Sequence, residues 1–160
     1  RLTFDIYEED KLTLEEYLNR VLFYKKRPFT IAQFQTFIFD QSKPFTDMID
    51  LLTGLKKKYN LRIFAVSNEA REINEHRIRT FHLNSFIDAF ISSCYVHVRK
   101  PDLEIFRLAL DISQADKSQV IYIENTPMFV DIARSLGIES ILHTDYATTK
   151  KQLEQFGLQL

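Results

Sequence analysis

The chain has 160 residues, of which 45% are hydrophobic and 27% charged, and its formal net charge is −1 at pH 7. These values are typical of a globular domain, and the three glycines and four prolines argue against a disordered or loop-rich chain. The balanced charge gives no electrostatic reason to bind nucleic acid or an anionic membrane. A single cysteine, Cys94, excludes an internal disulfide framework and favours a reducing, cytoplasmic location.

The first sixty residues predict helices. Thr13 with Glu16 and Thr30 with Gln33 have the spacing of capping boxes, and apolar residues follow each pair at helical intervals. A third helix is expected over residues 44–59. Ahead of these helices, among the first six residues, only Leu2, Phe4 and Ile6 are apolar, and they alternate with other residues, which suits an edge of a sheet more than its central strand.

From residue 61 the pattern changes to short apolar runs that alternate with amphipathic segments. This alternation is typical of βαβ units around a parallel sheet. We therefore predict an α/β chain with a Rossmann-like parallel sheet and helices on both faces. The expected strands are 61–66, 89–92, 120–123 and 140–142, and the expected helices are 70–81, 103–112, 128–136 and 148–156.

Polar residues follow three of the expected strands. Ser67 and Asn68 follow the first, Lys100 follows the second after a short extended segment, and Glu124 and Asn125 follow the third. Ligands of open α/β sheets bind outside the carboxyl ends of the strands. A hydroxyl, backbone N–H groups and a lysine suit a phosphate, and a neighbouring carboxylate suits Mg²⁺. We expect Ser67, Asn68 and Lys100 to bind phosphate, and Glu124 with Asn125 to hold the metal.

Each of these residues also has a structural interpretation. Ser67 could cap the next helix, Lys100 could lie in a surface turn before Pro101, and Glu124 could cap a helix of its own. Their common position after successive strands favours a shared site over three separate caps.

Three segments together resemble motifs of the haloacid dehalogenase-like hydrolases. Val66-Ser67-Asn68 is similar to the second motif, Arg99-Lys100-Pro101-Asp102 to the third, and Tyr122-Ile123-Glu124-Asn125 to the fourth. The resemblance implies a small helical cap, here residues 1–44, and a Rossmann-like hydrolase core, here residues 45–160. It further implies Mg²⁺-dependent hydrolysis of a phosphomonoester, a small phosphorylated metabolite, through an aspartyl phosphate.

Two departures from the family pattern weigh on this interpretation. The first motif, a central strand ending in Asp-x-Asp, is missing, and Asp5 reads as part of the lead-in to the cap. Without that strand, two pairs of strands should face each other across a gap about one strand wide. We therefore expect either that residues before Arg1 were omitted, which we favour, or that another segment fills the gap, and we expect no turnover by residues 1–160 alone. In the fourth motif, neutral Asn125 stands where a second acid is usual.

Other functions are compatible with parts of the pattern. A non-catalytic relative that binds a ligand or a protein partner would explain the missing first motif. A phospho-receiver domain also uses a hydroxyl and a Lys-Pro pair, but two further βα units follow Lys100, which excludes it. Cys94 is expected to be buried in a strand context and His97 to lie on an extended segment, while Arg71 could reach a substrate anion.

Overall fold

The computed structural model describes residues 2–160, and the first quarter of them is helical, as expected. Both predicted capping boxes are present, at Thr13 with Glu16 and at Thr30 with Gln33. The first residues form a helix and bury Tyr7 against the next helix, so Asp5 does not end a central strand. The helices are α1 (Leu2–Glu8), α2 (Leu14–Val21), α3 (Ile31–Gln41) and α4 (Thr46–Tyr59).

The rest of the chain alternates parallel strands and helices, which confirms the predicted fold class. The strands are β1 (Phe64–Ser67), β2 (Ala89–Ser92), β3 (Ile121–Glu124) and β4 (Glu139–Leu142). The longer helices are α5 (Arg71–Thr80), α7 (Leu103–Ser113), α8 (Pro127–Ser135) and α9 (Tyr146–Gln155), and the single-turn elements are η1 (Leu83–Ser85), α6 (Ser93–Val96) and η2 (Lys117–Gln119).

The extended segment expected around His97 is wrong. The short helix α6 follows β2 directly, and His97 ends that helix with a positive φ of 57°. Cys94 therefore lies in a helix, where it is fully buried. The apolar residues at alternate positions in this segment pointed to a strand, but a single helical turn buries them equally well.

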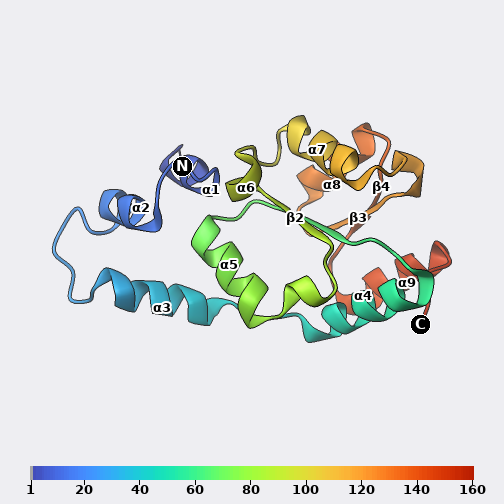
Figure 1. The fold of residues 1–160 in the computed structure, drawn as a ribbon, viewed down its shortest axis with the longest axis horizontal. Helices are drawn as coiled ribbons and strands as arrows, with labels where there is room; N and C mark the ends of the chain where they lie inside the picture. The colour runs from blue at the N-terminus through green and yellow to red at the C-terminus, as the bar shows by residue number, and fades with distance from the viewer. Residues whose placement is uncertain (1) are drawn as a thin grey trace.

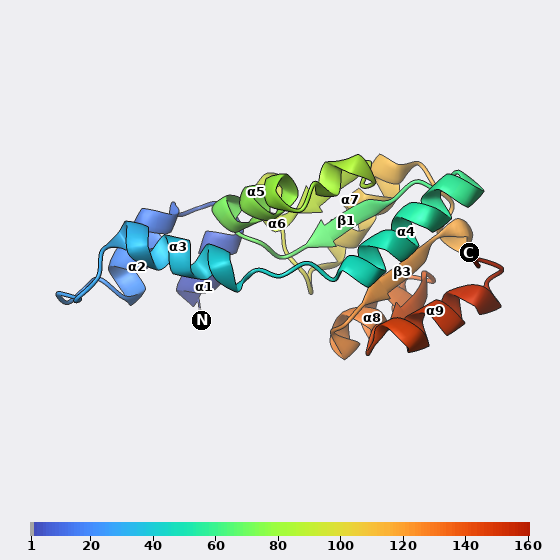
Figure 2. The same cartoon turned by 90° about the horizontal axis from the view of Figure 1, so that it is seen from below.

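The strands form two separate parallel pairs. In one pair β1 lies beside β2 with Ser67 opposite Ser92, and in the other β3 lies beside β4 with Glu124 opposite Leu142. Within residues 2–160 no strand is hydrogen-bonded to the second edge of β1 or of β3. The expected interruption in the middle of the sheet is thus confirmed (Figure 2).

Helices cover both faces of the strand pairs. On one face, Ile91 of β2 packs in a buried cluster with Ile105 and Phe106 of α7 and Ala133 of α8. On the other face, Ile141 of β4 packs with α4 and α9. Because both faces are covered, the strands carry apolar side chains at successive positions, as buried parallel strands do.

Helices α1, α2 and α3 lie at one end of the molecule, away from the strands (Figure 1). A third buried cluster joins Leu14 and Leu18 of α2 to Ala70, just before α5. The division into a cap of residues 1–44 and a core of residues 45–160 stays a prediction. None of the helices formed by residues 2–160 is both long and apolar enough to cross a bilayer.

Candidate active site

A buried lysine joins the ends of the two strand pairs. The Lys100 ammonium donates to the Val66 carbonyl at 3.0 Å, near the end of β1, and to the Glu124 carboxylate at 2.6 Å, at the end of β3. It also contacts the Tyr122 hydroxyl at 3.2 Å. The Lys100 and Glu124 side chains are only 7% and 8% exposed. We call Val66, Lys100, Tyr122 and Glu124 the strand-end cluster.

The Glu124 carboxylate has hydrogen-bond donors on both oxygens. One oxygen accepts from Lys100 and from the Tyr122 hydroxyl, and the other accepts from the backbone N–H groups of Asn125 and Thr126. Burial raises the pKa of Glu124, but the hydrogen bonds from Lys100 and Tyr122 outweigh burial, so this pKa lies below its usual value. Glu124 is therefore ionised near neutral pH, and its charge is balanced by Lys100.

Asn68 fixes the backbone that carries Lys100. Its side-chain amide donates to the Lys100 carbonyl and accepts from the Lys100 N–H, both at 2.7 Å. Both functional groups of the side chain are thus engaged with the protein. Asn68 reaches the expected site, but its side chain positions the lysine.

Ser67 ends β1 and does not cap a helix. The residue before the first turn of α5 is Ala70, and the Ser67 hydroxyl donates to the hydroxyl of Ser92 at 3.1 Å across the strand pair. Asp102, two residues after Lys100, caps α7. The interpretation of Ser67 as a helix cap is therefore wrong. Lys100 does lie in a turn, which the Asp102 N–H closes on the Arg99 carbonyl, but the lysine is buried and the turn does not place it on the surface.

Asn125 lies at the same rim and is exposed, directly after Glu124. Carboxylate and amide oxygens are the hard ligands that Mg²⁺ prefers, often one or two from the protein with water and substrate oxygens completing the shell. Within residues 2–160 no three acidic, histidine or cysteine side chains gather as a metal cluster. Glu124 and Asn125 carry oxygen donors of the kind that Mg²⁺ prefers, but each Glu124 oxygen already accepts two hydrogen bonds, so a metal at Glu124 would replace one of these donors.

Sequence reasoning missed the role of Tyr122. Residues two apart in a strand point to the same face, so a tyrosine two positions before Glu124 was a usable signal. Its hydroxyl donates to Glu124 at 2.7 Å, and burial followed by this hydrogen bond raises the pKa of Tyr122 above its usual value. Tyr122 therefore stays a neutral donor beside the glutamate.

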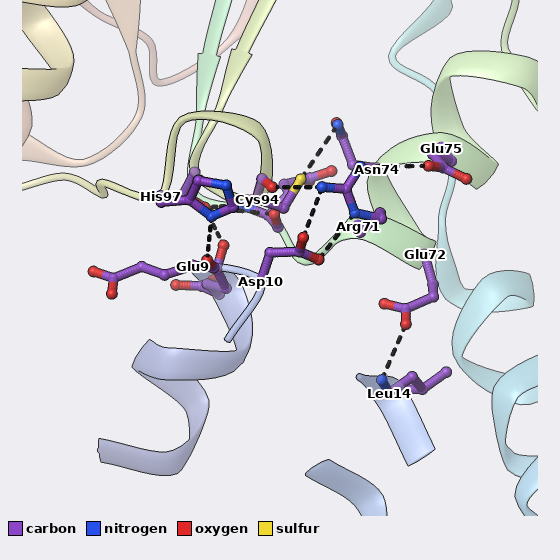
Figure 3. A network of polar contacts seen from close by, with 12 residues as sticks. Glu9, Asp10, Leu14, Arg71, Glu72, Asn74, Glu75, Cys94 and His97 are labelled. Carbon is purple, nitrogen blue, oxygen red and sulfur yellow. Dashed lines mark hydrogen bonds and ion pairs between the residues drawn. The ribbon is translucent and has the colours of Figure 1, made fainter. Parts of the chain in front are cut away.

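A second polar network connects α1 to the core. Arg99 binds Asp5 at 2.8 Å and Glu8 at 2.7 Å, and Arg71 makes two hydrogen bonds to Asp10, at 2.9 and 2.7 Å. Figure 3 shows Asp10 directed at Arg71, which lies on α5. We call these five residues the helix joint.

In and around the helix joint lie several residues whose roles the sequence did not decide. Arg71 binds Asp10 and the Cys94 carbonyl, so it is already held within the protein. The His97 ring contacts the Glu9 carbonyl at 2.9 Å (Figure 3). Asp5 lies on a helix in an ion pair, which agrees with its expected place in the lead-in to the cap and not at a strand end. Burial raises the pKa of the Cys94 thiol to about 11, so this cysteine is a structural residue.

Comparisons with known proteins agree with this geometry. A family model described as haloacid dehalogenase-like hydrolase matches residues 5–143. A phosphorylated carbohydrates phosphatase of Thermotoga maritima is 30% identical over 133 residues, which are 83% of this chain and 57% of the relative. A bifunctional epoxide hydrolase 2 of Sus scrofa is 34% identical over 79 residues, which are 49% of this chain and 14% of that enzyme. The chain thus spans 57% or less of the length of these two relatives.

Solved structures share the fold at low sequence identity. A HAD family enzyme of Bacteroides thetaiotaomicron, crystallised with magnesium and inorganic phosphate, matches with a TM-score of 0.76 at 18% identity. The match covers 88% of this chain and 73% of that one. A predicted HAD-like family hydrolase of Porphyromonas gingivalis has the same TM-score and identity and covers 96% of this chain and 78% of its own.

Proposed function

Because the chain belongs to the haloacid dehalogenase-like hydrolases, we propose that the protein hydrolyses phosphomonoesters of small metabolites with the help of Mg²⁺. The observation that carries this proposal is the strand-end cluster, where a buried lysine and a carboxylate meet at the ends of two parallel strands. The name of the Thermotoga relative and the magnesium and phosphate in the Bacteroides structure support it. Residues 1–44 would form a cap over a core of residues 45–160.

The residues of the site have distinct tasks in this proposal. The Lys100 ammonium and the Ser67 hydroxyl would bind phosphate oxygens, together with the backbone N–H of Asn68. Glu124 and Asn125 would hold Mg²⁺, which neutralises charge on the phosphate when bound. Tyr122 keeps Glu124 oriented toward Lys100 through its hydrogen bond.

The nucleophile would be an aspartate, which attacks phosphorus, releases the alcohol and is freed by water. Within residues 2–160, no aspartate forms a hydrogen bond or ion pair with Ser67, Lys100 or Glu124, and Asp5 is paired with Arg99. We therefore expect residues 1–160 alone to bind phosphate without turning over an ester.

Calorimetry with inorganic phosphate at low salt, with and without Mg²⁺, tests the proposal on residues 1–160. Phosphate should bind, Mg²⁺ should strengthen binding, and Lys100→Met should weaken it at least about tenfold, because a charge-assisted hydrogen bond is lost. The matched control is Lys151→Met, which removes an exposed lysine of α9 and should leave affinity unchanged. Circular dichroism of each variant separates loss of binding from loss of fold.

Two results would contradict this reading in different ways. A folded chain with no measurable phosphate affinity would favour a non-catalytic relative that binds another ligand or a protein partner. Robust Mg²⁺-dependent release of phosphate from an aryl phosphate would show that residues 1–160 contain a nucleophile, and Asp5→Asn would be the first variant to examine.

A further inference from the structure

Every hydrogen of the Lys100 ammonium has an acceptor within the strand-end cluster. The three acceptors are the Val66 carbonyl at 3.0 Å, the Glu124 carboxylate at 2.6 Å and the Tyr122 hydroxyl at 3.2 Å. The Phe129 ring also lies against the ammonium, with its centroid 4.9 Å from the nitrogen. A phosphate oxygen that binds Lys100 therefore has to take over a hydrogen that one of these three acceptors holds.

The release of Glu124 or of Val66 would be costly. Without the lysine, the Glu124 carboxylate, whose side chain is 8% exposed, would be a buried charge without a counter-charge. The Val66 carbonyl is a half-buried backbone acceptor, and it would lose a hydrogen bond from a charged donor. Both of these bonds are also shorter than the bond to Tyr122.

The Tyr122 hydroxyl loses least when the lysine releases it. Its contact with the ammonium is the longest of the three, at 3.2 Å. The hydroxyl keeps a second hydrogen bond in any case, because it donates to Glu124 at 2.7 Å. Tyr122 is therefore the acceptor that a phosphate oxygen can replace most easily.

We propose that Tyr122 is a positioning residue that holds the third hydrogen of Lys100 until a phosphate oxygen takes it, and that it thereby sets the affinity of the site for phosphate. The proposal rests on the proposed function, in which Lys100 binds phosphate. During the exchange the ammonium keeps its bonds to Val66 and Glu124, and one N–H turns from the phenol oxygen to phosphate. The hydroxyl keeps its own proton on Glu124, so no proton is transferred.

A residue with this role affects folding and binding in opposite directions. The hydroxyl stabilises the chain without ligand, because it serves both the buried ammonium and the buried carboxylate. Part of that stabilisation is lost when phosphate binds, so the hydroxyl weakens phosphate binding. A tyrosine that only shaped the site would support folding and binding alike.

The variant Tyr122→Phe tests this difference in sign. It removes the hydroxyl and keeps the ring, which packs edge-on against Phe106 with centroids 5.6 Å apart. Calorimetry with inorganic phosphate at low salt should show an affinity roughly three- to tenfold higher than in the unaltered chain, because one hydrogen bond no longer has to be exchanged. Urea unfolding should show that the same variant is less stable. The matched control is Tyr146→Phe, which removes the hydroxyl of a half-buried tyrosine on α9 and should leave phosphate affinity unchanged.

A second measurement follows the exchange in the unaltered chain and does not depend on the folding of any variant. The NMR shift of a tyrosine Cζ carbon depends on the hydrogen bonds of its hydroxyl. The Cζ signal of Tyr122 should move as inorganic phosphate is added, whereas the signal of Tyr146 should stay in place. A Tyr122 signal that does not move at saturating phosphate would overturn the proposal.

The outcomes distinguish this inference from the proposed function. Tighter phosphate binding together with lower stability in Tyr122→Phe supports the exchange. Equal or weaker binding by the folded variant, while the unaltered chain binds phosphate, would overturn the exchange and leave the proposed function intact. If neither chain binds phosphate although both are folded, both proposals are wrong.

Discussion

The strand-end cluster and the helix joint both pair charged side chains from segments that are distant in the sequence. They differ in how far these side chains are buried. In the cluster one lysine serves three partners, and its side chain is 7% exposed. In the helix joint two arginines serve three carboxylates, and the Arg71 side chain is 40% exposed. A buried charge without its partner is costly, whereas an exposed one is solvated by water. The cluster should therefore be sensitive to each member, whereas in the joint the loss should be smaller at the Arg99–Glu8 pair and smallest at the exposed Arg71–Asp10 pair.

The largest effect should come from Lys100→Met. This change leaves the Glu124 carboxylate buried without its counter-charge, and we expect the free energy of unfolding to fall by about 3 kcal/mol. Urea unfolding followed by circular dichroism measures it. The double variant Lys100→Met with Glu124→Gln should recover part of the loss, because no buried charge is then left unpaired. A loss below about 1 kcal/mol for the single variant would mean that water reaches the glutamate.

An intermediate effect is expected from Arg99→Gln in the helix joint. Arg99 binds Asp5 and the largely buried Glu8, whose side chain is 8% exposed, so we expect a loss of about 1–2 kcal/mol. Amide exchange in α1 should accelerate more than exchange in β3, because the lost contacts hold that helix. Arg107→Gln on the exposed side of α7 is the control and should change neither. Equal acceleration in both elements would show that α1 does not open separately from the core.

A smaller effect is expected from Asp10→Asn. The Asp10–Arg71 pair is two-pronged but partly solvated, with side chains 27% and 40% exposed, so its loss should cost less than about 1 kcal/mol. A double-mutant cycle with Arg71→Gln isolates the coupling energy. A coupling energy well above that value would mean that the Asp10–Arg71 pair stabilises the fold as strongly as the buried pair of the strand-end cluster. The predicted difference between the two networks would then be wrong.

The pH dependence of stability should have opposite signs at Glu124 and at Glu8. The lowered pKa of Glu124 means that its stabilising contribution is present above the usual value of 4.5 and is lost as pH falls through the lower folded value. Burial, only partly opposed by Arg99, raises the pKa of Glu8. Its contribution is therefore present below 4.5 and is lost as pH rises through the folded value.

Unfolding free energies of Glu124→Gln and Glu8→Gln, measured from about pH 2.5 to 7 against the unaltered chain, check both signs. Relative to that chain, Glu124→Gln should become less harmful as pH falls, and Glu8→Gln should become less harmful as pH rises. The same slope in both variants would contradict the contrast.

Local patterns in the sequence predicted most of the fold. The capping boxes at Thr13 and Thr30 could be predicted because the capping residue and the apolar residues that follow at helical spacing indicate the same helix within a few positions. The segment around His97 failed for the opposite reason, because four residues cannot distinguish one helical turn from a strand. At the start of the chain the alternation of apolar residues did not reveal α1, which forms where Tyr7 packs against α2.

The candidate site was predictable in its location and less so in its internal contacts. The placement of Lys100 and Glu124 after parallel strands is topological, so the sequence could bring them together. Which atoms meet depends on side-chain geometry across the interrupted sheet, and no local pattern encodes it. The use of both ends of the Asn68 amide on Lys100, and the pairing of Arg99 with α1, are contacts of this kind.

The contact between Asn68 and Lys100 has a consequence for how the site can vary. An amide both donates and accepts, and this one forms with the Lys100 peptide the same two-bond pattern that a neighbouring strand would form. The lysine is thereby tied to a residue 32 positions earlier, immediately after the end of β1, and the two segments form one rigid unit. Aspartate has the right shape but no donor, and leucine has neither group. A substitution of Asn68 would therefore also move the Lys100 ammonium, although the lysine itself is unchanged.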